Sequence, residues 1–212
     1  MRRLGRLVIG VLATGILGSV PAAGQAIAGG ELPPAGYGSL KQDNINLRIS
    51  GTEIEVRFLP LDERLTRLLA PDAYTSLHGL VESKRAAIEA AARQSGLTNP
   101  GLVLVSFFAL RPAAQFDPDL VNISYRGQFE RPAAIVPYTS NFSGRQLDVR
   151  QQASAIYLFD EPLPVFEPFE VVYGGGKAAW NDEVLRRIGV ERVRVQSRAA
   201  ADQKPDSAKG KP

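Results

Sequence analysis

The segment VVYGGGKAAW places three glycines before a lysine, which resembles the composition of a phosphate-binding loop. Such a loop reads G-x-x-x-x-G-K-[ST], because its backbone N–H groups and its lysine bind phosphate while its hydroxyl binds magnesium. Gly176 and Lys177 fit this pattern, but Val171 stands at the first glycine position and Ala178 at the hydroxyl position. We therefore predict no nucleotide site here, and we interpret the glycines from Gly174 onward as a hinge between a last strand and a C-terminal helix.

His78 is the only histidine and the chain has no cysteine, so a catalytic triad or a histidine metal site would depend on this residue. Ser76 lies two positions away, which on a helix places the two side chains roughly 200° apart and out of hydrogen-bonding reach. His78 borders an apolar helical stripe one turn from Tyr74 and Glu82, which is typical of a structural histidine. Zinc or copper sites of ordinary composition are not expected.

Acidic residues flank several expected turns: Asp117 and Asp119, Asp160 and Glu161, Glu167 and Glu170. Glycosidase chemistry needs two carboxylates about 5–10 Å apart, so these residues could supply an acid and a base or nucleophile. Aspartate next to proline also belongs in turns for conformational reasons, and we interpret these residues first as turn residues. Calcium needs six or more oxygen ligands, and Asp117 and Asp119 offer only two carboxylates. We assign no catalytic, cofactor-binding or metal-ligating residue.

The positive charges of the chain are concentrated at its ends. Arg2, Arg3 and Arg6 are the only charges in the first 26 residues, and without them 22 basic residues balance 22 acidic ones. Nucleic-acid binding requires a basic face, so no nucleic-acid partner is expected.

The N-terminal arginines precede an apolar run, residues 7–20, and then small residues, which is the layout of a secretory signal peptide. The run is shorter than the about 20 residues that a membrane-spanning helix needs. We predict a signal peptide over residues 1–26, with cleavage after Ala26 or Ala28 and no stable membrane span afterwards. An uncleaved anchor is the alternative.

The absence of cysteine means that the exported protein must be stabilised by packing alone, since small secreted domains often rely on disulfides. Together with the signal peptide, this favours a bacterial protein in a periplasmic or secreted location. In that setting the Asn-X-Ser triplets at Asn122 and Asn141 are interpreted as chance matches.

Residues 27–43 are rich in glycine and proline and are predicted to be a flexible leader, so that a single domain spans residues 44–197. Two alternating segments then predict a hairpin with one apolar face, formed by Ile45, Leu47, Ile49, Ile54, Val56 and Phe58. A two-residue turn at Gly51 and Thr52 would place Ile49 opposite Ile54 and Arg48 opposite Glu55.

After Pro60 the apolar period changes to that of helices, which predicts a helical insertion over residues 61–96. Asp62 and Glu63 open a short helix that Pro71 ends, and Asp72 caps a longer helix that runs to about Ser95. The apolar stripe of the longer helix contains Tyr74, Leu77, Val81, Ile88 and Ala91.

The second half of the chain returns to strands. Residues 102–110 are apolar nearly throughout, as in a strand covered on both faces. Further strands are predicted at residues 120–125, 133–138, 153–159 and 169–173, with an optional short strand near 147–149. A C-terminal helix capped near Asn181 would carry Trp180, Val184, Leu185 and Ile188, although Val193 and Val195 would also suit a short strand. Residues 198–212 are polar and are predicted to be a disordered tail.

The block from Arg131 to Gly175 resembles the later strands of immunoglobulin-like accessory domains in exported bacterial proteins. It contains a strand that ends in a proline-bearing loop, a leucine-containing hairpin, and the apolar strand Ile156-Tyr157-Leu158-Phe159-Asp160. The resemblance implies a β-sandwich and carries no catalytic residues with it. The expected fold is therefore α+β, with a β-sandwich-like (immunoglobulin-like) core of about seven strands, an inserted helical pair and a C-terminal helix.

These features favour a non-catalytic binding or structural module in the periplasm or cell envelope, with a protein or glycan partner and no cofactor. The helical pair is the expected contact surface, because an immunoglobulin-like core does not need it. The alternative is a carboxylate-dependent hydrolase acting on envelope polysaccharide.

Overall fold

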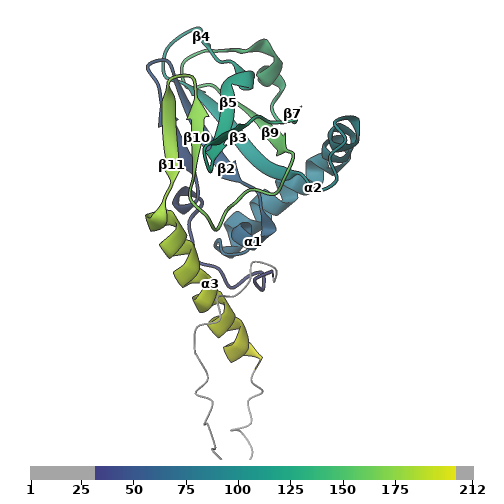
Figure 1. Cartoon of the computed structure of the whole chain (residues 1–212), viewed down its shortest axis with the longest axis vertical. Coiled ribbons are helices and arrows are strands. Elements are labelled where there is room, and N and C mark those ends of the chain that lie inside the picture. Colours follow the sequence, from purple (N-terminus) through teal and green to yellow (C-terminus); the bar gives the residue numbers. More distant parts are fainter. Residues whose placement is uncertain (1–31, 204–212) are drawn as a thin grey trace, which may run out of the picture. The chain divides into compact units, whose positions relative to one another are not determined.

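The computed structural model describes residues 32–203, so the expected signal peptide and the end of the expected tail lie outside the described residues. Within this range the chain is α+β, with eleven strands in antiparallel sheets and a C-terminal helix (Figure 1). The strands are β1 (Leu47–Ser50), β2 (Ile54–Pro60), β3 (Gly101–Ala109), β4 (Ala114–Gln115), β5 (Val121–Tyr125), β6 (Gln128–Glu130), β7 (Ala134–Pro137), β8 (Gln146–Leu147), β9 (Gln152–Phe159), β10 (Phe169–Tyr173) and β11 (Gly176–Trp180). The α-helices are α1 (Glu63–Thr66), α2 (Pro71–Gln94) and α3 (Asp182–Asp202), and the 3-10 helices are η1 (Gln42–Asn44), η2 (Pro118–Leu120) and η3 (Ser140–Gly144).

The strands form two main sheets and one small ribbon. The five-stranded sheet has the order β1-β2-β3-β9-β7, the four-stranded sheet has the order β11-β10-β5-β6, and β4 pairs with β8. All seven strands expected from the sequence are present. The additional strands are β4, β6, β8 and β11, of which β8 corresponds to the optional short strand.

Aromatic contacts connect the inner faces of the two main sheets. The ring centroids of Phe58 on β2 and Phe169 on β10 lie 6.4 Å apart, and those of Phe107 on β3 and Tyr173 on β10 lie 5.6 Å apart. Tyr157 on β9 is fully buried, and its hydroxyl donates to the carbonyl oxygen of Pro118 at 3.1 Å. These contacts link the two main sheets within one hydrophobic core, which also includes Leu77 and Ile88 of α2.

The first hairpin has the predicted apolar face but a different register. All six predicted apolar residues are buried, whereas Ile49 faces Val56 and Arg48 faces Arg57. The backbone N–H of Gly51 donates to the carbonyl oxygen of Ile54 at 2.9 Å, so the chain turns one position later than predicted. The prediction of the register was therefore wrong by two residues, and a shift of two keeps every side chain on its face.

The helices of the insertion contribute directly to the core. Asp62 caps α1 by accepting a hydrogen bond from the Arg64 backbone N–H. The predicted cap of α2 at Asp72 was wrong, because Ala70 occupies the N-cap position and Asp72 lies in the first turn. Pro71 was predicted to end the first helix, but it instead begins α2 in the first helical turn, where its missing N–H has no cost. The insertion also buries six large side chains, namely Leu61, Leu65, Leu68, Leu69, Leu77 and Ile88.

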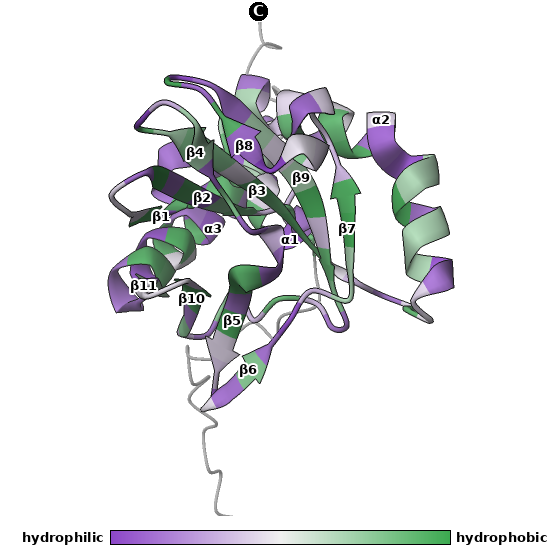
Figure 2. Cartoon of the chain, turned by 90° about the horizontal axis from the view of Figure 1, so that it is seen from above, coloured by the Kyte–Doolittle hydropathy of each residue, from purple (hydrophilic) through white to green (hydrophobic). Residues whose placement is uncertain are grey.

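Helix α2 covers part of the outer face of the five-stranded sheet. It lies beside β7, while β1 and β2 lie at the opposite edge of that sheet (Figure 2). Its main contacts within the sheet are with β7 and β9.

The glycine-rich segment forms a hairpin rather than the predicted hinge. Tyr173 pairs with Gly176, and Gly174, with φ of +55°, and Gly175 form the turn between β10 and β11. Gly176 permits a close approach between the sheets, since a Cβ at this position would lie 2.6 Å from Cγ2 of Ile49 on β1. Trp180 therefore ends a strand, and it does not belong to the helix.

Helix α3 begins where the sequence predicts and ends later. Asn181 caps it by accepting hydrogen bonds from the backbone N–H groups of Glu183 and Val184. The helix continues through Val193 and Val195 to Asp202, past the predicted start of the tail at residue 198. No helix within residues 32–203 combines the length and the apolar character needed to cross a membrane.

The described part of the predicted leader is held against the domain. Ser39 donates to the buried carboxylate of Glu191 from its backbone N–H at 2.9 Å and from its hydroxyl at 2.8 Å. Leu40 is buried, and a Cβ at Gly38 would lie 2.3 Å from the backbone of Leu68. Residues 38–40 are therefore held in place by contacts with α3 and with the residues after α1.

Candidate functional site

His78 lies on α2, where it contacts Glu63 of α1 and Tyr74. Its Nδ1 lies 3.0 Å from Oε1 of Glu63, and its ring centroid lies 5.5 Å from that of Tyr74. Glu63 also accepts hydrogen bonds from Arg67 at 2.6 Å and from the Tyr74 hydroxyl at 3.2 Å. Partial burial raises the pKa of Glu63, but the hydrogen bonds from Arg67 and His78 outweigh this effect and hold the pKa below its usual value. The cluster joins α1 to α2.

The acidic turn residues do not converge on one site. Asp117 and Asp119 precede β5 and lie 3.6 and 3.3 Å from the guanidinium of Arg145. Glu167 lies at the other end of β5, where it accepts hydrogen bonds from Tyr125 and Arg126 at 2.5 and 2.6 Å. The five residues of β5 span roughly 16 Å at about 3.3 Å per residue. This separation is too large for two carboxylates that act on one glycosidic bond.

Glu170 and the asparagines of the two Asn-X-Ser triplets have structural partners, whereas Asp160 and Glu161 follow the end of β9 and are exposed. Glu170 forms an ion pair with Lys177 at 2.8 Å on the outer face of the four-stranded sheet. The side-chain nitrogens of Asn122 and Asn141 donate to the carbonyl oxygens of Leu120 and Gln152. Within residues 32–203, no group of three or more His, Asp or Glu residues is arranged to hold a metal ion.

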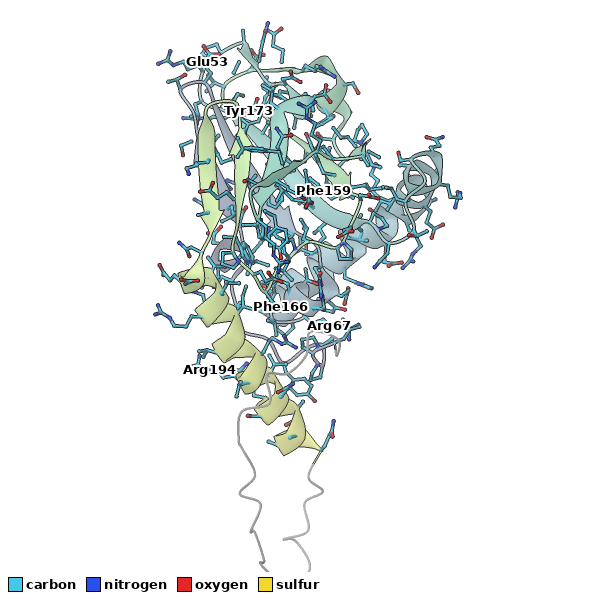
Figure 3. The ribbon with its side chains drawn as sticks, viewed as in Figure 1. Glu53, Arg67, Phe159, Phe166, Tyr173 and Arg194 are labelled. Atoms are coloured by element: carbon cyan, nitrogen blue, oxygen red, sulfur yellow. The ribbon has the colours of Figure 1, made fainter. Side chains whose placement is uncertain are left out.

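A surface that the sequence analysis did not identify lies at one end of the sheets. We call it the loop-end surface, and it consists of residues 52–53, 110–113, 148–151 and 174–175. Hydrogen bonds join its loops, because the Leu110 N–H donates to the carbonyl oxygen of Glu53 at 2.8 Å and the Arg150 N–H donates to that of Ala109 at 3.2 Å. Figure 3 shows Glu53 and Tyr173 at this end, with Arg194 of α3 at the other.

A cavity of about 440 Å³ opens between two of these turns. Its wall contains Ile49 and Ile54 from the first hairpin, Tyr173 from β10, and the side chain of Gln115. The backbone of the glycine turn completes the wall, which leaves main-chain groups accessible to a ligand. The Tyr173 hydroxyl accepts a hydrogen bond from the Asp117 N–H at 3.2 Å, and burial raises the pKa of this tyrosine. The ring is therefore held in place and stays uncharged.

Exposed apolar side chains and unusual backbone conformations occur in the loops of this surface. Leu110 is 49% exposed and Val149 is 44% exposed, although both belong to segments that otherwise enter the core. Ala113 and Arg150 adopt φ angles of +54° and +65°, a conformation that residues other than glycine rarely adopt. Such residues often cluster at binding sites, because the surrounding structure must hold them in place.

The sequence contains a weak signal for this surface. Leu110 and Val149 each end a strand-like segment beside turn residues, and this pattern does not distinguish a buried strand end from an exposed one. Only the pairing of β3 with β9 shows that both residues reach the same end of the sheet.

Comparison with known proteins identifies no relative, since no family model, curated protein or solved structure matches the chain significantly.

Proposed function

We propose that the protein is an exported, non-catalytic binding module of the bacterial periplasm or envelope, and that it binds a protein or glycan partner through the loop-end surface. The observation that carries this proposal is the exposure of Leu110 and Val149 at the end of the sheets where a cavity of about 440 Å³ also opens. Exposed apolar patches can mark interaction sites. Loops on a rigid sheet scaffold are a common location for such sites.

The structure favours the loop ends over the helical pair as the contact surface. Leu65, Leu68 and Leu69 of the helical insertion have no exposed surface, and removal of this insertion would open the core. The outward face of α2 carries ion pairs such as Arg85 with Glu82, which are typical of a solvated helix. The insertion therefore has a sufficient structural role.

The immunoglobulin-like resemblance belongs to the same proposal. The contacts between the rings of Phe58 and Phe169 support two sheets packed as a β-sandwich. In immunoglobulin-like domains, loops at one end of the sandwich commonly bind ligands. The placement of the loop-end surface agrees with that arrangement.

Site-specific photo-crosslinking tests the proposed contact surface. A photoreactive amino acid would replace Leu110, Val190 or Glu82 in the full chain, expressed in cells and activated before the envelope is fractionated. Val190 on α3 is a matched control because it is 46% exposed, and Glu82 probes the helical pair. We expect a discrete adduct from position 110 alone, which mass spectrometry would assign to a peptide or a glycan.

Two outcomes would overturn this assignment. Adducts from position 82 and not from position 110 would return the contact surface to the helical pair. Equal adducts from all three positions would show random collisions instead of a binding site.

A further inference from the structure

A second cavity lies on the outer face of the five-stranded sheet. Its volume is about 210 Å³, and its lining includes Arg57 and Leu59 of β2 and Leu104, Ser106 and Phe108 of β3. These side chains alternate with core-facing residues and therefore point away from the loop-end cavity, whose wall contains the inner-facing Ile49 and Ile54. The main contacts of α2 are with β7 and β9, whereas β2 and β3 supply most of the lining of this cavity.

Two buried hydroxyl groups interrupt the apolar outer face of this sheet. Ser106 and Ser154 are 6% and 2% exposed, and their Oγ atoms lie 2.8 Å apart. Their neighbours along the same face include Leu104 and Ile156. Hydroxyl groups at such positions lower stability unless they are hydrogen-bonded, and apolar residues would pack there equally well.

The two hydroxyls hold Gln152 in a fixed orientation. Its Nε2 atom donates to Oγ of Ser154 at 2.8 Å and to Oγ of Ser106 at 3.3 Å. Within the described residues no hydrogen bond is found to its Oε1 atom, which is therefore available to accept one from a ligand. A fixed amide at the mouth of a cavity is a preorganised binding group.

The polar groups of this cavity are almost all neutral. Gln42, Asn46 and Gln152 provide amides, which both donate and accept hydrogen bonds. The only charged side chain in the lining is Arg57, and Glu55 neutralises it at 2.7 Å while the guanidinium stacks on the Phe108 ring at 4.1 Å. A charged ligand would meet no unpaired opposite charge here and would lose its hydration.

We propose that this cavity binds one ring of a neutral saccharide. Sugar hydroxyls both donate and accept hydrogen bonds, as the amides require, and the C–H face of a sugar matches the apolar floor formed by Leu104 and Phe108. The volume corresponds to about seven water molecules at roughly 30 Å³ each, so it has room for about one ring. This inference goes beyond the proposed function, because it concerns a second site on the other face of the sheet.

Nuclear magnetic resonance titration tests the proposal. The full chain without its signal peptide, labelled with ¹⁵N, would be titrated with the methyl glycosides of glucose, galactose, mannose and N-acetylglucosamine, and with methyl glucuronide as a charged control. We expect at least one neutral glycoside to shift the backbone amide signals of Ser106, Phe108 and Gln152. The charged glycoside is expected to shift them much less.

Three variants separate binding from folding. Gln42→Ala removes an amide that has no hydrogen bond within the described residues, so it should weaken binding about threefold to tenfold without changing stability. Gln152→Ala should weaken binding by a similar or larger factor. Gln128→Ala is the matched control, because Gln128 is an exposed glutamine on β6 outside this cavity.

The proposal is overturned if none of the neutral glycosides shifts these signals, or if Gln42→Ala and Gln128→Ala bind equally well. It is also overturned if methyl glucuronide binds as tightly as the best neutral glycoside. Photo-crosslinking from position 110 is independent of these results, so the two proposals can fail separately.

Discussion

The two ends of the sheets differ in how their side chains are used. At the basal end, formed by α1, α3 and the segment before β1, large side chains such as Leu65, Leu68 and Trp180 have no exposed surface. At the loop-end surface, Leu110 and Val149 are about half exposed, and a cavity opens between two of its turns. The basal end is closed by packing, whereas the other end presents apolar groups to solvent.

Charged side chains at the basal end also form specific contacts. Glu191 of α3 is 2% exposed, and its carboxylate accepts hydrogen bonds from Ser39 and from Arg198 at 2.8 Å. Arg192 of α3 and Arg64 of α1 both stack on Phe166, at 4.6 and 5.4 Å from the ring centroid. These groups connect elements that lie far apart in the sequence and therefore hold the basal end together.

The largest expected loss of stability follows from Trp180→Ala at the basal end. The Trp180 ring is fully buried, stacks on Phe169 at 5.4 Å, and donates from Nε1 to the carbonyl oxygen of Val165 at 3.1 Å. We expect the free energy of unfolding to fall by about 3–5 kcal/mol, measured by urea denaturation. A loss below about 1 kcal/mol would show that the basal packing is not required.

Glu191→Ala should lower the free energy of unfolding by about 2–3 kcal/mol, because it removes the acceptor of both Ser39 donors and the charged partner of Arg198. Glu183→Ala on the same helix is the matched control. Its carboxylate is 63% exposed and pairs with Arg187, so its loss should change stability by about 0.5 kcal/mol or less. Equal effects of the two variants would contradict the role of the buried carboxylate.

Glu191 should also make stability depend on pH. Burial raises the pKa of Glu191, but hydrogen bonds from Ser39 and Arg198 outweigh burial and hold the pKa below its usual value. A lowered folded-state pKa contributes stability above the unfolded value of about 4.3, and this contribution is lost as the pH falls through the folded pKa. Unfolding curves between neutral pH and pH 3 should therefore show a smaller acid-induced loss in Glu191→Ala than in the natural protein. Parallel losses in both proteins would contradict this assignment.

Two neighbouring glycines should respond differently to alanine. Gly176→Ala would place a Cβ 2.6 Å from the buried Ile49 side chain and should cost about 1–2 kcal/mol, measured by thermal and urea unfolding. A Cβ at Gly175 would meet no atom within 4 Å, so Gly175→Ala should change stability by about 0.5 kcal/mol or less. If Gly175→Ala lowered stability more than Gly176→Ala, the close approach of the two sheets would not lie at Gly176.

The smallest effect on stability is expected at the loop-end surface. Leu110→Ser and Val149→Asp change side chains that are already about half exposed, so each should alter the free energy of unfolding by about 0.5 kcal/mol or less. A loss of several kcal/mol in either variant would show that these side chains belong to the core.

The structural features that were predicted correctly are those that local sequence patterns determine. The alternation from Ile45 to Phe58 predicted one buried face, and Asn181 was correctly predicted to cap α3. The hairpin register could not be predicted, because a turn at Gly51 or one position later buries the same residues. Strand β11 was missed because Gly176, Lys177 and Ala178 have low strand propensity, and pairing with β10 determines its conformation.

Long-range contacts account for the other differences. The segment before β1 was predicted to be flexible from its glycine and proline content, whereas Ser39 binds Glu191, which lies 152 residues later. The loop-end surface also assembles residues from four separate turns. No local pattern in the sequence specifies which of these turns meet.

The most direct test of the central claim is photo-crosslinking from position 110 in a chain that also carries Val149→Asp. If the loop-end surface binds the partner and contributes little to folding, the adduct should disappear while the free energy of unfolding stays unchanged. An adduct of undiminished yield in a folded Val149→Asp protein would contradict the account.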